Sequence, residues 1–121
     1  MADPTMHGQR ILVVEDEYLL AMSFHDRLQD LGAVVLGPVG NLDNALALIR
    51  SEASIDGAVV DINLGGELAY PAAGLLMEQD IPFVFTTGYD DVAIPACFGH
   101  VPRLQKPADI NRIVQALTGA S

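Results

Sequence analysis

Four short apolar runs in the sequence each end in polar residues of kinds that bind metal ions or phosphate. The residues at these ends are Glu15-Asp16, Asp61, Thr86-Thr87 and Lys106-Pro107. A fully apolar run of this length is typical of a strand that is buried on both faces, as in a parallel sheet. In such a sheet the ligand site lies beyond the carboxyl ends of the strands. We therefore expect these carboxylates, hydroxyls and the ammonium to converge there.

The chemistry of this set suits a divalent metal ion and a phosphoryl group. Glu15, Asp16 and Asp61 would raise one another's cost of ionisation, and a hard cation with oxygen ligands, such as Mg²⁺, relieves that cost. Three carboxylates and the Lys106 ammonium leave a net charge of minus two, which Mg²⁺ neutralises. Lys106 and the Thr87 hydroxyl can then bind phosphoryl oxygens. Asp61 is the predicted nucleophile, because a carboxylate can form an acyl phosphate.

The rest of the sequence alternates apolar runs with segments of helical period, which is the signature of repeated β-α units. The runs predict strands at 11–14, 33–36, 58–60, 83–85 and 104–105. The helical periods predict helices at about 18–31, 42–49, 71–79 and 108–117. The chain is therefore predicted to be an α/β protein with a mostly parallel sheet.

The length of 121 residues suits a single domain. We expect it to span residues 10–121, behind a flexible N-terminal lead of residues 1–9. Right-handed crossovers leave two common doubly wound strand orders for five such units. In one of them, the flavodoxin-like order 2-1-3-4-5, the first and third strands are neighbours, and their acidic residues would meet at the switch point.

The segment between the fourth and fifth predicted strands breaks the helical pattern. Pro95, Gly99 and Pro102 fall within Tyr89 to Pro102. Proline removes an amide donor and clashes with the preceding helical turn, and glycine adds backbone entropy. We therefore expect a fourth helix that is short or missing.

The composition excludes several classes of function. Sixteen acidic against six basic residues give a net charge of -10, which does not suit binding to a nucleic-acid backbone. No stretch approaches the ~20 apolar residues of a membrane span. Cys97 is the sole cysteine, so no internal disulfide points to an oxidising compartment. We expect a cytoplasmic protein.

With these motifs, the chain resembles the receiver domain of bacterial two-component response regulators over essentially its whole length. Glu15-Asp16 resembles the acidic pair of the family, Asp61 its phosphoacceptor and Thr87 its hydroxyl switch residue. Lys106-Pro107 resembles the lysine and proline that end the fifth strand. The resemblance implies a flavodoxin-like, doubly wound, five-stranded parallel sheet with helices on both faces, and a single receiver domain at 10–121.

The resemblance also implies a phosphoprotein that accepts its phosphoryl group from a histidine kinase in a Mg²⁺-dependent step. Asp61 would become the aspartyl phosphate. Asp16, Asp61 and the backbone carbonyl of Asn63 would be the metal ligands, and Glu15 would act through a water molecule. Phosphotransfer and autodephosphorylation would be self-catalysed, so the chain would not be a classical enzyme.

Further roles follow from the resemblance for the residues around the phosphoryl group. Thr87-Gly88 and Lys106 would bind it and respond to it. Asn63 and Tyr89 would flank the path of the hydrolytic water and tune the lifetime of the acyl phosphate. The peptide bond before Pro107 is a candidate for the cis form, which is a minority state of X-Pro bonds in general.

The segment Pro82 to Tyr89 resembles a subgroup of stand-alone receivers with a Phe-x-Thr-Gly, or FATGUY-like, motif at the fourth strand. The partners of that subgroup are often kinases of the HWE or a related class. Two features depart from typical receivers: Arg103 stands where an aromatic residue is usual, and the broken segment from Tyr89 to Pro102 replaces a helix.

Signalling is expected to use protein-protein contact, because no output domain follows the last predicted helix. The expected partners are a histidine kinase and a histidine phosphotransfer protein. Two alternatives stay open. One is a receiver-like interaction module that works without phosphorylation. The other is an aspartyl-phosphate phosphohydrolase, but such enzymes need Asp-x-Asp on the first strand, whereas Asp61-Ile62-Asn63 lies on the third.

Overall fold

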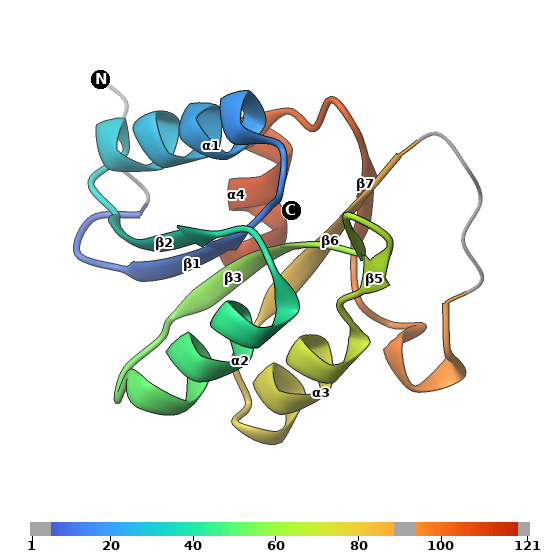
Figure 1. Ribbon diagram of the computed structural model, residues 1–121. Helices are drawn as coiled ribbons and strands as arrows, with labels where there is room; N and C mark the ends of the chain where they lie inside the picture. Colours follow the sequence, from blue (N-terminus) through green and yellow to red (C-terminus); the bar gives the residue numbers. More distant parts are fainter. Residues whose placement is uncertain (1–5, 89–93, 119–121) are drawn as a thin grey trace.

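The computed structural model describes residues 6–88 and 94–118, which form a sheet with helices on both faces (Figure 1). Within these ranges the sheet has five strands in the order β2-β1-β3-β6-β7, and neighbouring strands run parallel. They are β1 (Arg10–Val14), β2 (Val34–Val39), β3 (Gly57–Asp61), β6 (Phe83–Thr87) and β7 (Arg103–Gln105). This is the flavodoxin-like order, so the predicted fold class is confirmed.

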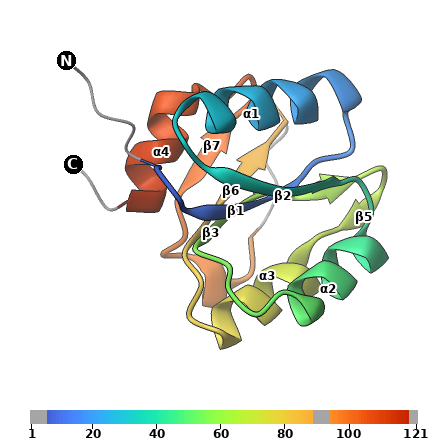
Figure 2. The same ribbon diagram turned by 90° about the vertical axis from the view of Figure 1, so that its left-hand side faces the viewer.

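The helices form two layers around the sheet. Helices α1 (Tyr18–Asp30) and α4 (Ile110–Thr118) cover one face, and α2 (Leu42–Ser51) and α3 (Tyr70–Glu78) cover the other (Figure 1, Figure 2). Alternate residues of a strand point to opposite faces. On β3, Val59 therefore packs in the core under α1 and α4, whereas Ala58 and Val60 pack in the core under α2 and α3.

Local sequence signals explain where the helices begin and end. The side chain of Asn41 caps α2, because its Oδ1 accepts the Asn44 N–H at 2.8 Å. Pro71 lies in the first turn of α3, where a missing amide donor costs nothing. Gly32 follows α1 with a φ of 92°, a conformation that glycine adopts without strain.

A small hairpin follows β3 at the carboxyl end of the sheet. Strands β4 (Asn63–Leu64) and β5 (Glu67–Leu68) pair antiparallel around Gly65 and Gly66. Both glycines have positive φ, 64° and 99°, as a two-residue hairpin turn of this kind requires. The hairpin brings the backbone after Asp61 back toward the end of the sheet.

The segment before β7 contains a single 3-10 turn, η1 (Ala96–Phe98), in place of a full helix. The expectation of a short or missing fourth helix is therefore confirmed for residues 94–102, while residues 89–93 lie outside the described ranges. Phe98 is buried and anchors this turn. Its ring centroid lies 5.7 Å from that of Tyr70 and 5.7 Å from that of Phe85.

Residues 6–9, the described part of the expected N-terminal lead, contact the rest of the domain. Met6 is fully buried in the core under α1 and α4. The Gly8 N–H donates to the Gly32 carbonyl at 2.8 Å, and the Val34 N–H donates to the Gln9 carbonyl at 2.7 Å. Residues 6–9 therefore pack against the domain, because a single methionine fills space beside the sheet.

Among the described residues, no helix combines the length and the apolar character that crossing a lipid bilayer requires.

Candidate functional site

The carboxyl ends of the strands surround a pocket of about 340 Å³. The lining residues come from the ends of β1, β3, β6 and β7 and from the hairpin: Asp16, Glu17, Asp61, Asn63, Gly65, Gly66, Gly88 and Lys106. Asp16, Asp61 and Lys106 were expected here from the polar residues that end the apolar runs, and Asn63 and Gly88 from the family resemblance. The hairpin approaches the acidic pair closely, since a Cβ atom on Gly65 would lie 3.6 Å from Asp16 Oδ2.

Three carboxylates form the acidic part of the site. Glu15, Asp16 and Asp61 each offer an oxygen, and these oxygens lie within 4.8 Å of one another. Glu15 and Asp61 are buried, whereas Asp16 is exposed. They come together because β1 and β3 are neighbours in the sheet, with Val14 opposite Val60 in register.

Lys106 is the cation of the site and contacts three carboxylates. Its Nζ lies 2.8 Å from Asp61 Oδ2, 3.0 Å from Glu17 Oε1 and 3.2 Å from Glu15 Oε2. The sequence led us to expect Lys106 near Glu15 and Asp61, but not these direct contacts. Glu17 was missed. The sequence signal that could have indicated it is its position two residues after Glu15. In extended backbone, alternate side chains point the same way.

Burial and crowding shift the pKa values of the buried groups. Burial raises the pKa of Glu15 to about 7, the Asp61 carboxylate adds to this rise, and the Glu17 N–H opposes it. Burial also raises the pKa of Asp61, against the hydrogen bond from Lys106. Burial alone would lower the pKa of Lys106, but Asp61, Glu17 and Glu15 together raise it above its ordinary value.

The donor set fits a hard divalent cation. Glu15 Oε1 is buried and has no hydrogen-bond partner among the described residues. The three clustered carboxylates are oxygen donors of the kind that Mg²⁺ and Ca²⁺ prefer. Burial makes ionised Glu15 and Asp61 costly, and a bound cation removes that cost.

Asn63 lines the pocket, as its predicted role as a ligand requires. Its N–H donates to Asp61 Oδ1 at 3.2 Å, and its side-chain Oδ1 accepts the Gly66 N–H at 2.6 Å. The first bond leaves Asp61 with one oxygen held by the backbone and the other held by Lys106. The second fixes the hairpin turn against the site.

Thr87 and Gly88, at the carboxyl end of β6, differ in their placement. Gly88 lines the pocket, whereas Thr87 is buried at the end of β6 and is not among the lining residues. Thr87 is joined to the fifth strand, because its carbonyl accepts the Lys106 N–H at 2.8 Å. Thr86, not Thr87, stands opposite Asp61 in register. Tyr89 lies outside the described residues.

The fifth strand of the sheet carries the last predicted features. The Lys106–Pro107 peptide bond is cis. Arg103 is exposed at the start of β7, where typical receivers have an aromatic residue. Among the described residues, an aromatic cluster of Tyr70, Phe83, Phe85 and Phe98 lies on the face under α2 and α3.

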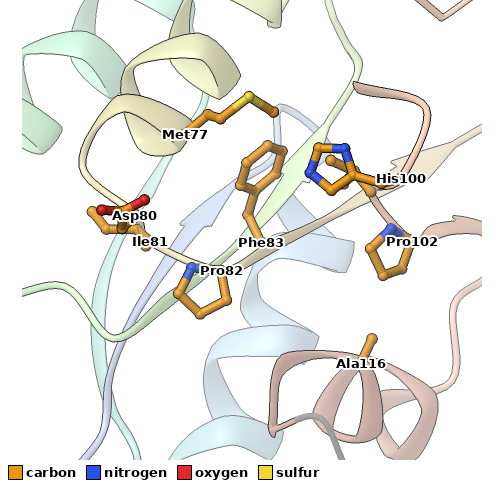
Figure 3. A pocket seen from close by; sticks show the side chains of 9 residues that line it. Met77, Asp80, Ile81, Pro82, Phe83, His100, Pro102 and Ala116 are labelled. Atoms are coloured by element: carbon orange, nitrogen blue, oxygen red, sulfur yellow. The ribbon is translucent and has the colours of Figure 1, made fainter. Parts of the chain in front are cut away.

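A second cavity lies at the opposite end of β6 and lacks the chemistry of the first. It has a volume of about 330 Å³, and Met77, Phe83, Pro102 and Ala116 are among its mainly apolar lining residues (Figure 3). Asp80 and His100 lie at its rim as separate polar groups (Figure 3). None of the functional residues predicted from the sequence lines this cavity, so the site at the carboxyl ends of the strands is the functional candidate.

No protein-family model and no curated protein matches the chain. Solved structures do match. The solution structure of SdrG from Sphingomonas melonis Fr1 is 39% identical with a TM-score of 0.78, and the match covers 98% of this chain and 97% of SdrG.

Two further structures are similar at lower identity. A response regulator receiver protein from Sinorhizobium medicae WSM419 is 25% identical with a TM-score of 0.78, over 93% of both chains. A response regulator protein from Burkholderia pseudomallei, which holds a phosphorylated aspartic acid, a calcium ion and citrate, is 28% identical with a TM-score of 0.78. That match covers 90% of this chain and 66% of the Burkholderia chain. From the fold, the site and these relatives together, the chain belongs to the response regulator receiver domains.

Proposed function

We propose that this receiver domain accepts a phosphoryl group from the phosphohistidine of a histidine kinase onto Asp61, and that it signals through protein-protein contact. The observation that carries the proposal is the setting of Asp61. Its carboxylate ends the central strand β3, lines the open pocket and contacts the Lys106 ammonium at 2.8 Å. A nucleophile held between a cation and an open pocket suits phosphoryl transfer.

The transfer exchanges one bond to phosphorus for another. A carboxylate oxygen of Asp61 forms a P–O bond as the P–N bond of phosphohistidine breaks. The electron pair of the broken bond stays on the imidazole nitrogen, which takes up a proton. Lys106 counters negative charge on the phosphoryl oxygens during this exchange, and positioning of this kind supplies most of the catalysis in phosphoryl transfer.

Asp16, Asp61 and the Asn63 carbonyl would hold Mg²⁺, with Glu15 acting through a water molecule. The bound cation would supply charge neutralisation to the carboxylates and to the phosphoryl oxygens. The clustered carboxylates and the unpartnered Glu15 Oε1 support this assignment. The phosphorylated aspartic acid and calcium ion of the Burkholderia protein support it as well.

Thr87, Gly88 and Lys106 are proposed to bind the phosphoryl oxygens. The hydrogen bond between the Lys106 N–H and the Thr87 carbonyl joins β6 to β7, so a shift of one strand end is passed to the other. A BeF3-activated conformation has been solved for SdrG, which is 40% identical to this chain in that structure with a TM-score of 0.71. A phosphoryl mimic thus activates a relative of the same size.

The finer assignments are proposals of the same kind. Phe85 to Gly88 carry the Phe-x-Thr-Gly motif, which favours the stand-alone FATGUY-like subgroup and a kinase of the HWE or a related class. A histidine phosphotransfer protein is the second candidate donor. Asn63 and Tyr89 are proposed to tune the lifetime of the acyl phosphate.

The proposal is tested by following labelled phosphate. Purified HWE-class kinases carrying labelled phosphohistidine, and a small acyl phosphodonor, are each mixed with the protein in Mg²⁺ or in chelator. The expected product is a hydroxylamine-sensitive acyl phosphate that forms in Mg²⁺, is absent from Asp61→Asn and is retained by Asp43→Asn. Asp43 is an exposed acid on α2 and serves as the control.

Other outcomes would contradict the proposal. Labelling retained by Asp61→Asn would place the acceptor elsewhere. No labelling of the wild type by any donor would favour an interaction module that works without phosphorylation. Repeated hydrolysis of a phosphomonoester by the wild type would favour a phosphohydrolase.

A further inference from the structure

Glu17 makes a contact that its place in the fold does not require. It is the N-cap residue of α1, yet its side chain makes no capping hydrogen bond. Its Oε1 instead lies 3.0 Å from Lys106 Nζ, although the side chain is 63% exposed. Glutamate is not among the residues that cap helices well, so helix capping does not explain where this side chain lies.

The backbone of Glu17 is held so that the contact can form. Glu15 Oε2 accepts the Glu17 N–H at 3.0 Å, and the backbone at Glu17 is extended. The same Glu15 oxygen contacts Lys106. The buried acid therefore fixes both the ammonium and the backbone of the exposed acid that meets it.

The Lys106 ammonium has three N–H donors, and the carboxylates of Asp61, Glu17 and Glu15 can accept one each. An oxygen of an incoming phosphoryl group must take the place of one of them. Loss of the ammonium by Glu15 or Asp61 leaves a buried carboxylate without its cation, which is costly. If Glu17 loses its contact with the ammonium, the cost in free energy is small, because water solvates an exposed carboxylate.

We infer that Glu17 is a positioning residue that competes with the phosphoryl group for Lys106 and so sets how tightly the pocket holds that group. The inference rests on the proposed function. In the unphosphorylated protein, Glu17 holds the ammonium toward the solvent side of the pocket. When a phosphoryl group binds, Lys106 keeps its buried partners and exchanges Glu17 for a phosphoryl oxygen.

The release of Glu17 also changes a neighbouring groove. Glu17 and Lys106 line both the pocket at Asp61 and an adjacent groove of about 460 Å³. The remaining lining of this groove is Leu19, Leu20, Ser23 and Pro107. The ion pair of Glu17 and Lys106 thus lies between the pocket and the groove. When this ion pair breaks, binding in the pocket changes the shape of the groove beside α1.

The sequence provides a clean probe, because Lys106 is its single lysine. Protein labelled with ¹³C and ¹⁵N in lysine therefore gives one lysine side-chain signal by NMR. The signal is recorded first in metal-free protein and then during titration with beryllofluoride in Mg²⁺. Glu17→Gln removes the charge and the ion pair. Glu17→Asp keeps the charge but is one methylene too short for the contact at an unchanged backbone. Glu67→Gln, on β5, removes an exposed charge at the same end of the sheet.

Both Glu17 variants are expected to shift the Lys106 signal of the metal-free protein, and Glu67→Gln is not. Both are expected to bind beryllofluoride about two- to fivefold more tightly than the wild type, as loss of an exposed ion pair allows. At saturation the Lys106 signal of the wild type should coincide with that of the variants, because Glu17 no longer contacts the ammonium.

Two results separate this inference from the proposed function. A wild type that binds beryllofluoride with the same affinity as both Glu17 variants would contradict the competition alone. A wild type that binds no beryllofluoride would contradict the proposed function and the competition with it. If Glu17→Asp matches the wild type while Glu17→Gln and Glu67→Gln bind equally tightly, charge alone is responsible and the positioning role is wrong.

Discussion

The Lys106 ammonium lies 2.8 Å from the Asp61 carboxylate, although 45 residues separate the two in the sequence. Their strands are not neighbours, because β6 lies between β3 and β7. Lys106 therefore reaches across the carboxyl end of β6, and this crossing closes one side of the pocket. The same contact stabilises two buried acids, so the chemistry of the site and the stability of the fold depend on one side chain.

Removal of the Lys106 charge should destabilise the metal-free protein. Lys106→Met keeps much of the aliphatic stem but leaves Glu15 and Asp61 buried without their cation. We expect the free energy of unfolding at pH 7.5 to fall by about 3 kcal/mol, measured by urea denaturation. Arg112→Met, at an exposed position of α4, serves as the control for lost positive charge. An equal loss in the two variants would show that the buried contacts contribute nothing.

The metal-free protein should become less stable as the pH rises. The pKa of Glu15 in the folded protein is about 7, against an ordinary value of 4.5, so the folded state binds this proton more tightly than the unfolded state. The stability from this group is therefore present below pH 4.5 and is lost as the pH rises through about 7. The raised pKa of Asp61 acts in the same direction. Each pKa unit corresponds to about 1.4 kcal/mol, so we expect a loss of about 3 kcal/mol for Glu15.

Urea denaturation at pH 5.5, 6.5 and 7.5 in chelator measures this slope. Glu15→Gln should flatten it, because the buried group then no longer titrates. Glu78→Gln, at the exposed end of α3, should retain the slope. This variant is the control for the removal of one negative charge from a protein with a net charge of -10. A slope that Glu15→Gln leaves unchanged would assign the pH dependence to the overall charge.

The strand order could be predicted because its signals are local and strong. Runs such as 11–14 and 58–60 are apolar at every position, and parallel strands need helical crossovers of one hand. The hairpin at Asn63–Leu68 was not predicted as strands, since two-residue strands show no period. The packing of Met6 left no pattern either, because one methionine fills a gap that only the tertiary structure creates.

The site was predictable where a residue ends a strand and not where a contact depends on side-chain direction. Asp61 ends β3 and Lys106 directly follows β7, so the topology alone brings them to one edge. Glu17 directly precedes α1, where the helix dipole favours an acidic residue, so its presence there did not indicate a role in the site. Its contact with Lys106, 89 residues away, follows from the backbone fixed by Glu15.

Addition of Mg²⁺ should stabilise the protein through the acidic cluster. A ligand at a hundred times its dissociation constant stabilises the folded state by about 2.7 kcal/mol. We expect a smaller gain at pH 5.5 than at pH 7.5, because protons compete for the buried carboxylates. Asp16→Asn should remove most of the gain in thermal denaturation with and without Mg²⁺, whereas Asp43→Asn should retain it. Equal gains in the two variants would place the binding outside the cluster.

The turn before β7 should open locally when its aromatic anchor is removed. Phe98 is 6% exposed, and its ring contacts those of Tyr70, Phe83 and Phe85. Burial of a phenylalanine in a core contributes about 3–5 kcal/mol. The hydrogen bonds that close the turn, such as that from the Val101 N–H to the Phe98 carbonyl, span few residues. The turn can therefore detach without unfolding the sheet.

Amide exchange separates local opening from global unfolding. In Phe98→Ala, the amides of Gly99 and Val101 should exchange more than about tenfold faster than in the wild type. The amides of β1 and β3 should exchange only as fast as the global stability of the variant allows. Cys97→Ala, at an exposed position of the same turn, should leave these rates unchanged. If exchange in the turn and in β3 rose together, the turn would unfold only with the whole domain. The segment that replaces a helix would then be as firmly held as the sheet, and a partner would meet it as a fixed surface.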